Sequence, residues 1–336
     1  MLRAGIIGFG WWGKTLAGYL ADSDLLRPVL VVDPAAPARA AAQAMGLETA
    51  EGFEAALARA DVDAILICSP HGDHGAQIAA AARAGKHVFC EKPLCTTTQD
   101  VEMALAAVTR AGVQLGVGHE RRFEPAVIEL RQRFAAGEFG ALLAMEGNFS
   151  QDKFLALPPD NWRLSPTLAP VGPLSATGVH LVDLAVSLFG EPTEVWARLG
   201  TLGTSFANGD SLAITLAFAS GQTAQLTAIL TTPFMGRICV FGSQGWMEIR
   251  DRTHPEQPTG WDVTVTLRDK PGEARFFPPH PAVRDNLESF ARAAMGLAPY
   301  PVDHAQMSAT VRAFEAITRS AASGRIETVA QFRSPA

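Results

Sequence analysis

A glycine-rich turn near the start of the chain constrains its fold more than any other feature. The stretch "GFGWWGK" spans residues 8–14, follows the apolar segment "AGII" and opens the helix-like segment "KTLAGYLAD". Three bare positions at this spacing, between a strand and a helix, let a backbone turn sharply and approach a diphosphate closely. We therefore predict a strand–turn–helix unit with Gly8, Gly10 and Gly13 as its phosphate-binding turn.

The first 120 residues repeat this alternation of short apolar strands and alanine-rich helices. Strands apolar on both faces are typical of a parallel sheet covered by helices. We predict an α/β fold, a doubly wound dinucleotide-binding (Rossmann) domain over residues 1–120. The expected strands are 4–10, 27–33, 63–70, 86–93 and 113–119, with helices at 37–47, 52–60, 75–86 and 96–112.

The pattern then changes to that of an α+β domain, which we place at residues 121–336. Two hairpins are expected, over 211–230 and 236–250, because each pairs two apolar runs across a glycine-containing turn. A further strand is expected at 142–150, with helices at 125–137, 174–190, 282–296 and 303–322.

Composition excludes several classes of function. A net charge of −6 without any basic run argues against nucleic-acid binding, and no apolar run reaches the ~20 residues of a membrane span. The four cysteines have no zinc-type spacing, and no carboxylate or cysteine completes a site with His71 and His74. We predict a cytoplasmic protein with reduced thiols, no metal and no membrane partner.

Asp33 ends the second expected strand, about 20 residues after the glycine turn, where an acidic residue binds the adenine ribose hydroxyls. A 2′-phosphate would meet this carboxylate, and no basic residue follows before Arg39. We therefore predict NAD rather than NADP. The alternative is that Asp33 caps the next helix.

Two tryptophans, Trp11 and Trp12, occupy the positions between the glycines. Only the glycine positions need to be bare, so the indoles can project away from the phosphates. One interpretation places Trp11 on the domain surface and Trp12 toward the cofactor and the cleft between domains. In the other, both indoles are packing residues.

The stretch "GKHVFCEKPL" (85–94) places Glu91 and Lys92 at the carboxyl end of an expected strand, where ligands bind such sheets. Burial and neighbouring cations can tune a lysine for proton transfer. The simpler interpretation is an exposed Glu–Lys pair, against which Pro93 argues by fixing the backbone beside Lys92.

With "ICSPHGDH", "ERRFEP" and "GVHLVDLAVSLFGEP", these motifs resemble, in order and spacing, the Gfo/Idh/MocA oxidoreductases along nearly the whole chain. The resemblance implies a Rossmann domain followed by a domain with a large, mostly antiparallel open sheet that forms dimer or tetramer contacts. It also implies oxidation of a sugar or cyclitol secondary alcohol, or reduction of the ketone, with a nicotinamide cofactor.

The resemblance also implies roles for individual residues. Lys92 would be the acid/base, His180 a substrate-binding or proton-relay group, and Glu91 their neighbour at the nicotinamide. Further residues implied to contact the cofactor are Ser69 and His74, and those implied to contact the substrate are Arg122, Trp162 and Arg163.

One position departs from the family pattern. Many polyol dehydrogenases of this family carry an aspartate four residues before the histidine, where this chain has Ala176. Thr177 is a possible substitute, and Asp183, three residues after His180, could orient its imidazole.

The sequence thus predicts an NAD-dependent oxidoreductase acting on a sugar, cyclitol or related polyol. Two alternatives stay open. One is a dehydrogenase of a cyclic dihydrodiol or another less hydroxylated alcohol, and the other is a cofactor-sensing regulator that has lost catalysis.

Overall fold

The computed structural model describes residues 1–329, which form two compact units. Unit 1 contains Met1–Glu120 and Ala282–Met307, and unit 2 contains Arg121–Pro281 and the chain from Ser308 onward. The break after Glu120 falls where the sequence pattern changes. Residues 282–307, predicted as part of the second domain, return to unit 1, and residues 330–336 of that predicted domain lie outside the described chain.

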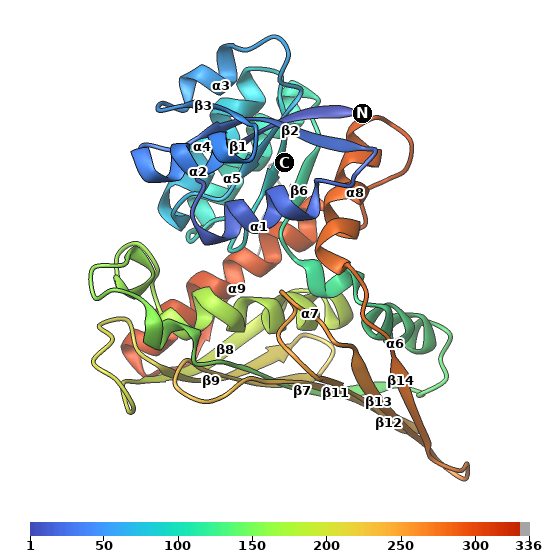
Figure 1. The fold of residues 1–336 in the computed structure, drawn as a ribbon. Coiled ribbons are helices and arrows are strands. Elements are labelled where there is room, and N and C mark those ends of the chain that lie inside the picture. Colours follow the sequence, from blue (N-terminus) through green and yellow to red (C-terminus); the bar gives the residue numbers. More distant parts are fainter. Residues whose placement is uncertain (330–336) are drawn as a thin grey trace. The chain divides into compact units, whose positions relative to one another are not determined.

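Unit 1 is built on a six-stranded parallel sheet with strand order β3-β2-β1-β4-β5-β6 (Figure 1). This confirms the predicted doubly wound fold. The strands are β1 (Leu2–Ile7), β2 (Leu26–Val32), β3 (Glu48–Ala50), β4 (Ala64–Ile67), β5 (His87–Cys90) and β6 (Leu115–Val117). The helices are α1 (Trp11–Tyr19), α2 (Ala36–Ala44), α3 (Glu54–Ala58), α4 (His74–Arg83), α5 (Thr98–Ala111) and α8 (Ala282–Ala294).

Helix α8 completes the core of unit 1. The ring of Phe290 meets that of Phe89 edge to face, with centroids 5.7 Å apart. A Cβ on Gly116 of β6 would lie 2.9 Å from atoms of both rings, so the glycine makes room for this contact. The side chain of Asn286 also donates to the Val117 carbonyl at 2.9 Å. Helix α8 therefore packs on the sheet of unit 1, although the strands that precede it in the chain belong to unit 2.

The glycine turn brings the start of α1 against the end of β1. Gly8 has a φ of +86°, a conformation that favours glycine. A Cβ on Gly13 would lie 2.1 Å from the Gly8 carbonyl oxygen. Helix and turn can therefore approach this closely only because both positions are bare.

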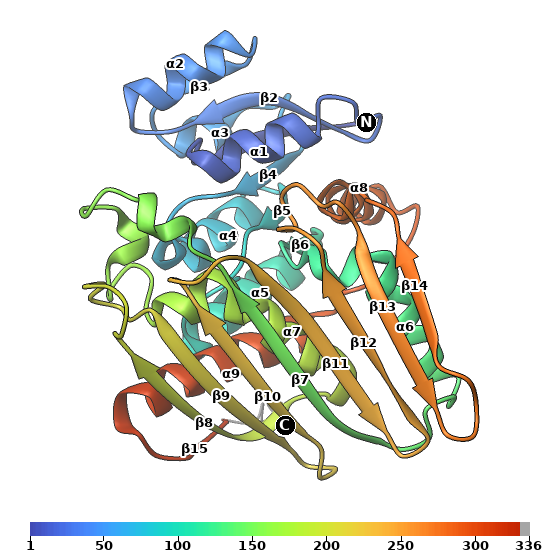
Figure 2. The same cartoon turned by 60° about the horizontal axis from the view of Figure 1, so that its bottom comes forward.

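Unit 2 is built on a nine-stranded sheet with order β14-β13-β12-β11-β7-β10-β9-β8-β15, antiparallel except for the β7–β10 pair (Figure 2). Side chains of α6, α7 and α9 share one apolar core with those of the strands. The strands are β7 (Leu142–Ser150), β8 (Pro192–Gly200), β9 (Ser211–Phe218), β10 (Thr223–Ile229), β11 (Met235–Gly242), β12 (Gly245–Asp251), β13 (Trp261–Leu267), β14 (Glu273–Phe277) and β15 (Glu327–Thr328). The helices are α6 (Pro125–Ala135), α7 (Val179–Phe189) and α9 (His304–Ser323), the last of which begins in unit 1 and belongs to unit 2 from Ser308 onward. The large, mostly antiparallel sheet and both predicted hairpins, β9–β10 and β11–β12, are confirmed.

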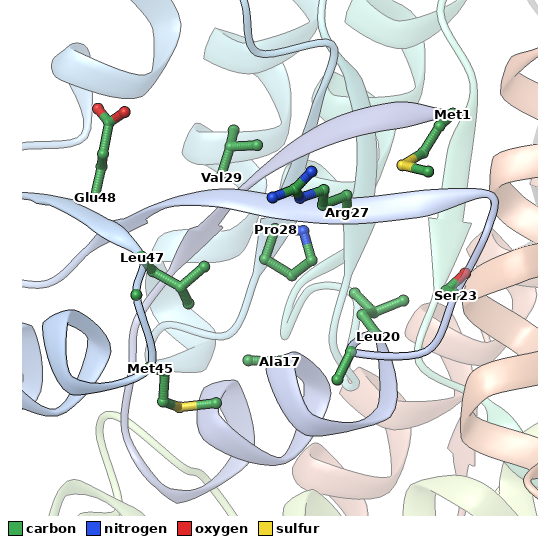
Figure 3. A pocket seen from close by; sticks show the side chains of 12 residues that line it. Met1, Ala17, Leu20, Ser23, Arg27, Pro28, Val29, Met45, Leu47 and Glu48 are labelled. Atoms are coloured by element: carbon green, nitrogen blue, oxygen red, sulfur yellow. The ribbon is translucent and has the colours of Figure 1, made fainter.

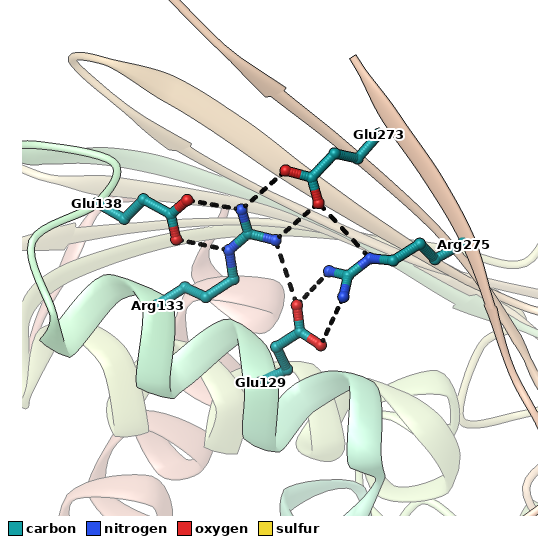
Figure 4. Close-up of polar contacts among 5 residues, drawn as sticks. All are labelled: Glu129, Arg133, Glu138, Glu273 and Arg275. Atoms are coloured by element: carbon teal, nitrogen blue, oxygen red, sulfur yellow. Dashed lines mark hydrogen bonds and ion pairs between the residues drawn. The ribbon is translucent and has the colours of Figure 1, made fainter. Parts of the chain in front are cut away.

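The edge strand β14 is joined to α6 by an ion network (Figure 4). Arg133 of α6 contacts three carboxylates, those of Glu129, Glu138 and Glu273, at 3.2, 2.7 and 3.3 Å. Arg275 of β14 contacts Glu129 and Glu273 in turn. Exposed pairs are individually weak, but charged groups on an edge strand also discourage pairing with another sheet.

Gly13 and its neighbour Gly18 in the same helix give a matched test of the turn. We expect Gly13→Ala to lower the free energy of unfolding by more than about 2 kcal/mol, because the new methyl group meets backbone. A Cβ on Gly18 would have no other atom within 4 Å, so Gly18→Ala should stabilise the helix by about 0.5–1 kcal/mol. Chemical denaturation of both variants measures this, and equal effects would contradict the tight approach.

Candidate active site

The start of α1 can accept an anion. Gly10 is the N-cap residue of the helix, and no side chain caps the first-turn N–H groups. Nothing lies within 4 Å of where a Gly10 Cβ would be. Helix N-termini with exposed N–H groups bind phosphates, so the predicted residues Gly8, Gly10 and Gly13 fit the diphosphate of a dinucleotide.

Asp33 links the end of β2 to the glycine turn. Its carboxylate accepts the Phe9 N–H at 2.7 Å and the Ala35 N–H at 2.8 Å. The second bond lies in the loop before α2, whose N-cap is Ala35, so Asp33 orders this loop without capping the helix itself. The Arg39 guanidinium donates to the carbonyls of Asp33 and Pro34, both at 2.8 Å. A carboxylate and a cation therefore both stand at the end of β2.

The two tryptophans have different environments. Trp11 is 44% exposed, whereas Trp12 packs against the apolar core of unit 1. Their rings meet edge to face with centroids 5.9 Å apart. The Trp12 indole N–H is buried and makes no bond of good geometry, yet it lies near enough to lower the pKa of Glu91.

His74 joins two loops at the carboxyl ends of β4 and β5. Its ring nitrogens lie 2.9 Å from the Pro93 carbonyl and 3.0 Å from that of Ser69. The imidazole is fully buried, and burial lowers its pKa. A neutral ring has one N–H, so it donates to one of these carbonyls and only packs against the other. His74 therefore lies between the loops of Ser69 and Lys92.

Glu91 is a buried carboxyl beside Lys92. Its Oε2 accepts the Lys92 N–H at 3.3 Å and would lie 2.5 Å from a Cβ on Gly118. Burial, followed by the charge of Glu120, raises the pKa of Glu91 to about 7. The carboxyl can therefore take up or release a proton near neutral pH within unit 1.

Unit 1 also has a cavity of about 570 Å³ away from these groups. Figure 3 shows it lined by Arg27, Pro28 and Val29 of β2, by α1, and by the loop before β3. These β2 residues precede the carboxyl end of the strand, where Asp33 stands. The cavity is therefore separate from the predicted dinucleotide site.

In unit 2, His180 lies in the first turn of α7 and is 3% exposed. Its ring centroid is 5.6 Å from that of Phe149, at the end of β7. Phe149 is not among the site residues predicted from the sequence. The available signal was its position one residue before the end of a strand that runs toward polar loops.

The turn before His180 is a π-helix (Leu174–Gly178) rather than an α-helix. Because a π-turn is wider, Ala176 is not strictly one turn before His180, and it packs against an apolar cluster that includes Phe154 and Leu164. The Thr177 hydroxyl is buried and donates to the Pro173 carbonyl at 3.3 Å. The structure thus gives Thr177 a backbone partner in the helix.

Arg122 and Asp183 form a buried ion pair. The guanidinium donates from Nε to Oδ2 at 2.7 Å and from Nη2 to Oδ1 at 2.6 Å, and both side chains are at most 2% exposed. Both carboxylate oxygens of Asp183 are therefore engaged by Arg122. This pairing gives Asp183 a structural partner, and its predicted role at the imidazole of His180 stays a prediction.

Trp162 and Arg163 form a short helix (Trp162–Leu164) capped by Asn161. The Arg163 guanidinium carbon lies 4.3 Å from the Trp162 ring centroid, a cation–π contact. The Arg163 carbonyl accepts the side chain of Asn208 at 2.8 Å. The pair is thus a fixed, half-buried platform.

Metal clusters and membrane spans are both absent from the described chain. Within residues 1–329, no three His, Cys, Asp or Glu side chains are grouped so as to bind a metal ion. No helix in the same range has both the length and the apolarity needed to cross a bilayer.

The raised pKa of Glu91 predicts a pH-dependent stability. Unfolded glutamate ionises near pH 4.3, so between about pH 4.3 and 7 the native state binds more protons than the unfolded state. The contribution of Glu91 to stability is therefore present at low pH and is lost as pH rises through 7. We expect the free energy of unfolding of the wild type to fall relative to Glu91→Gln from about pH 5 to 8. Glu120→Gln should narrow the pH range over which this difference develops, because the charge of Glu120 helps to raise the pKa of Glu91. Parallel curves of unfolding free energy against pH for the wild type and both variants would contradict the assignment.

The chain matches two models of a known protein family. Residues 2–119 match the family model for an oxidoreductase family with an NAD-binding Rossmann fold. Residues 127–248 match the model for the Gfo/Idh/MocA C-terminal domain.

Individual relatives agree with these matches. The chain is 31% identical to D-xylose 1-dehydrogenase (NADP(+)) 2 of Haloferax volcanii, over 86% of this chain and 87% of that protein. It is 33% identical to inositol 2-dehydrogenase of Rhizobium meliloti, over 73% and 74% of the two chains. The crystal structure of aldose–aldose oxidoreductase from Caulobacter crescentus superposes with a TM-score of 0.85 at 26% identity, covering 97% and 99%. The chain therefore belongs to the Gfo/Idh/MocA family of oxidoreductases.

Proposed function

We propose that this oxidoreductase is an NAD-dependent dehydrogenase of a secondary alcohol in a sugar, cyclitol or related polyol. One observation carries the proposal. The first turn of α1 has no side-chain cap and has open space at Gly10, and it lies in the same unit as Lys92. The names of the relatives, which are sugar and inositol dehydrogenases, support this substrate class. When bound, the nicotinamide supplies the hydride acceptor.

The protein must then position the alcohol and accept one proton. We assign proton transfer to the Nζ of Lys92, whose backbone is held by the Glu91 carboxyl. His180 of unit 2 is assigned to a substrate hydroxyl or to a proton relay. Trp162 and Arg163 are proposed to wall the substrate pocket, whereas Arg122 and Thr177 would act by holding α7 and its π-turn.

Lys92 can be tested directly. Lys92→Met should lower kcat by about 10²-fold or more with NADH binding intact, which is the usual scale for an acid/base group. Steady-state rates on a panel of aldoses and cyclitols measure the loss. Lys86→Met is the matched control, since Lys86 donates to the carbonyls of Arg59 and Val62. A Lys92→Met rate equal to wild type would refute the role.

The choice of NAD over NADP depends on Asp33. Its carboxylate is fixed by two backbone N–H groups and would repel a 2′-phosphate, although Arg39 stands beside it. We expect NADH to bind at least tenfold more tightly than NADPH, measured by energy transfer from tryptophan. Arg39→Ala should leave this ratio in favour of NADH, and comparable affinities in the wild type would contradict the proposal.

A less hydroxylated alcohol, such as a cyclic dihydrodiol, is a second candidate substrate. Ala176 favours it, because the family aspartate position is here packed on the apolar side chains of Phe154 and Leu164. Including dihydrodiols in the same substrate panel separates the two candidates by their kcat/KM values.

We also propose a cytoplasmic homodimer or homotetramer that associates through the nine-stranded sheet. Trp196 supports this, because its neighbours Val195 and Ala197 face the core while its own side chain is 37% exposed. A single-chain molar mass by light scattering would contradict self-association. The four cysteines of the described residues are free thiols.

A further inference from the structure

Two imidazoles of unit 2 pack on one phenylalanine. The ring centroid of Phe149 lies 5.6 Å from that of His180 and 5.7 Å from that of His254. Phe149 is 2% exposed, while His254 comes from the loop between β12 and β13 and keeps 20% of its side chain exposed. Both imidazoles are thus held against the same ring, and His254 is the more exposed of the two.

The loop fixes the orientation of His254. The backbone N–H of Glu256 donates to its Nδ1 at 3.2 Å, so Nδ1 is the acceptor and the ring proton lies on Nε2. The Glu256 carboxylate is 3.8 Å from Nδ1 and forms an ion pair with Lys153. The charges of Lys153 and Glu256 therefore offset each other beside the ring.

The same contacts lead back to the helix of His180. Lys153 begins the short helix Lys153–Ala156. The next residue, Phe154, packs in the apolar cluster that Ala176 joins. Ala176 lies in the π-turn that leads into α7. His254 is thus linked to the helix of His180 by two routes, one through Phe149 and the other through Glu256, Lys153, Phe154 and Ala176. We call these residues, with His180 and His254, the circuit.

We propose that His254 is a specificity-determining residue that donates from Nε2 to a substrate hydroxyl remote from the reacting carbon. This inference rests on the proposed dehydrogenase function. The Lys153–Glu256 pair adds no net charge beside His254, so the group offered there is the neutral Nε2–H, which a hydroxyl oxygen of a polyol can accept. A hydrogen-bond donor in such a site discriminates strongly against analogues that lack the matching hydroxyl.

The test compares His254→Phe, which keeps a ring on Phe149 but loses the donor, with His254→Gln, which keeps an N–H. The substrate is the best neutral aldose or cyclitol of the panel, together with its singly deoxygenated analogues and the matching uronic acid. We expect His254→Phe to lower kcat/KM for the full polyol about tenfold, through a higher KM. The analogue that lacks the hydroxyl bound by His254 should have the same kcat/KM in His254→Phe as in the wild type. His254→Gln should recover part of the loss on the full polyol. His304→Phe, the same change outside the circuit, should leave all ratios unaltered.

The outcomes separate this inference from the proposed function. An equal loss on every analogue, or no loss, would overturn the role of His254 even where Lys92→Met abolishes turnover. A loss confined to one hydroxyl would support it even where Lys92→Met stays active and the acid/base assignment falls. Calorimetric binding of the same analogues with NADH present gives the ratios without turnover. Failure of wild-type protein to bind any polyol of the panel would overturn both proposals.

Discussion

Unit 1 depends on how closely α1 can approach the end of β1. The two glycines that meet there leave no space for a side chain, since a Gly13 methyl would collide with the Gly8 carbonyl. That approach brings the amide of Phe9 onto the Asp33 carboxylate and places Trp12 near Glu91. The anion-accepting helix start and its link to the acidic end of β2 therefore depend on one backbone contact.

Unit 2 depends on two adjacent arginines instead. Arg121 contacts Asp251 at 2.8 Å, an acceptor that the Trp261 indole shares at 2.8 Å. Arg122 contacts Asp183 of α7. Buried ion pairs add little net stability, because desolvation offsets their attraction, but breaking one leaves an uncompensated charge. We interpret the pair of arginines as a device that fixes β12 and α7 relative to the start of the unit. Arg121 also lies 5.2 Å from the Phe149 centroid, so the same device supports the ring on which His180 packs.

Local patterns were sufficient to predict much of this architecture. The alternation of apolar strands and alanine-rich helices predicted the parallel sheet, and paired apolar runs predicted both hairpins of unit 2. Features set by distant residues were not predictable in this way. The Arg122–Asp183 pair joins residues far apart in sequence, and the contact between Phe89 and Phe290 is made across the segment Arg121–Pro281 of unit 2. The π-turn before His180 differs from an α-helical turn only in the number of residues per turn, and the residue types do not signal that difference. His254 stands in a loop with no periodic signal, so its place beside Phe149 emerges only once the strands are paired.

The discontinuity of unit 1 has a consequence for how the chain is made. A ribosome releases the six strands of the first sheet early, but α8, whose Phe290 fills the space above Gly116, follows only after nearly all of unit 2. Until then the nascent sheet carries an uncovered apolar patch around Phe89. Contacts of such long sequence separation are late and slow to form. The nucleotide-binding half, although first in the sequence, therefore cannot become fully native until most of the other unit has been synthesised.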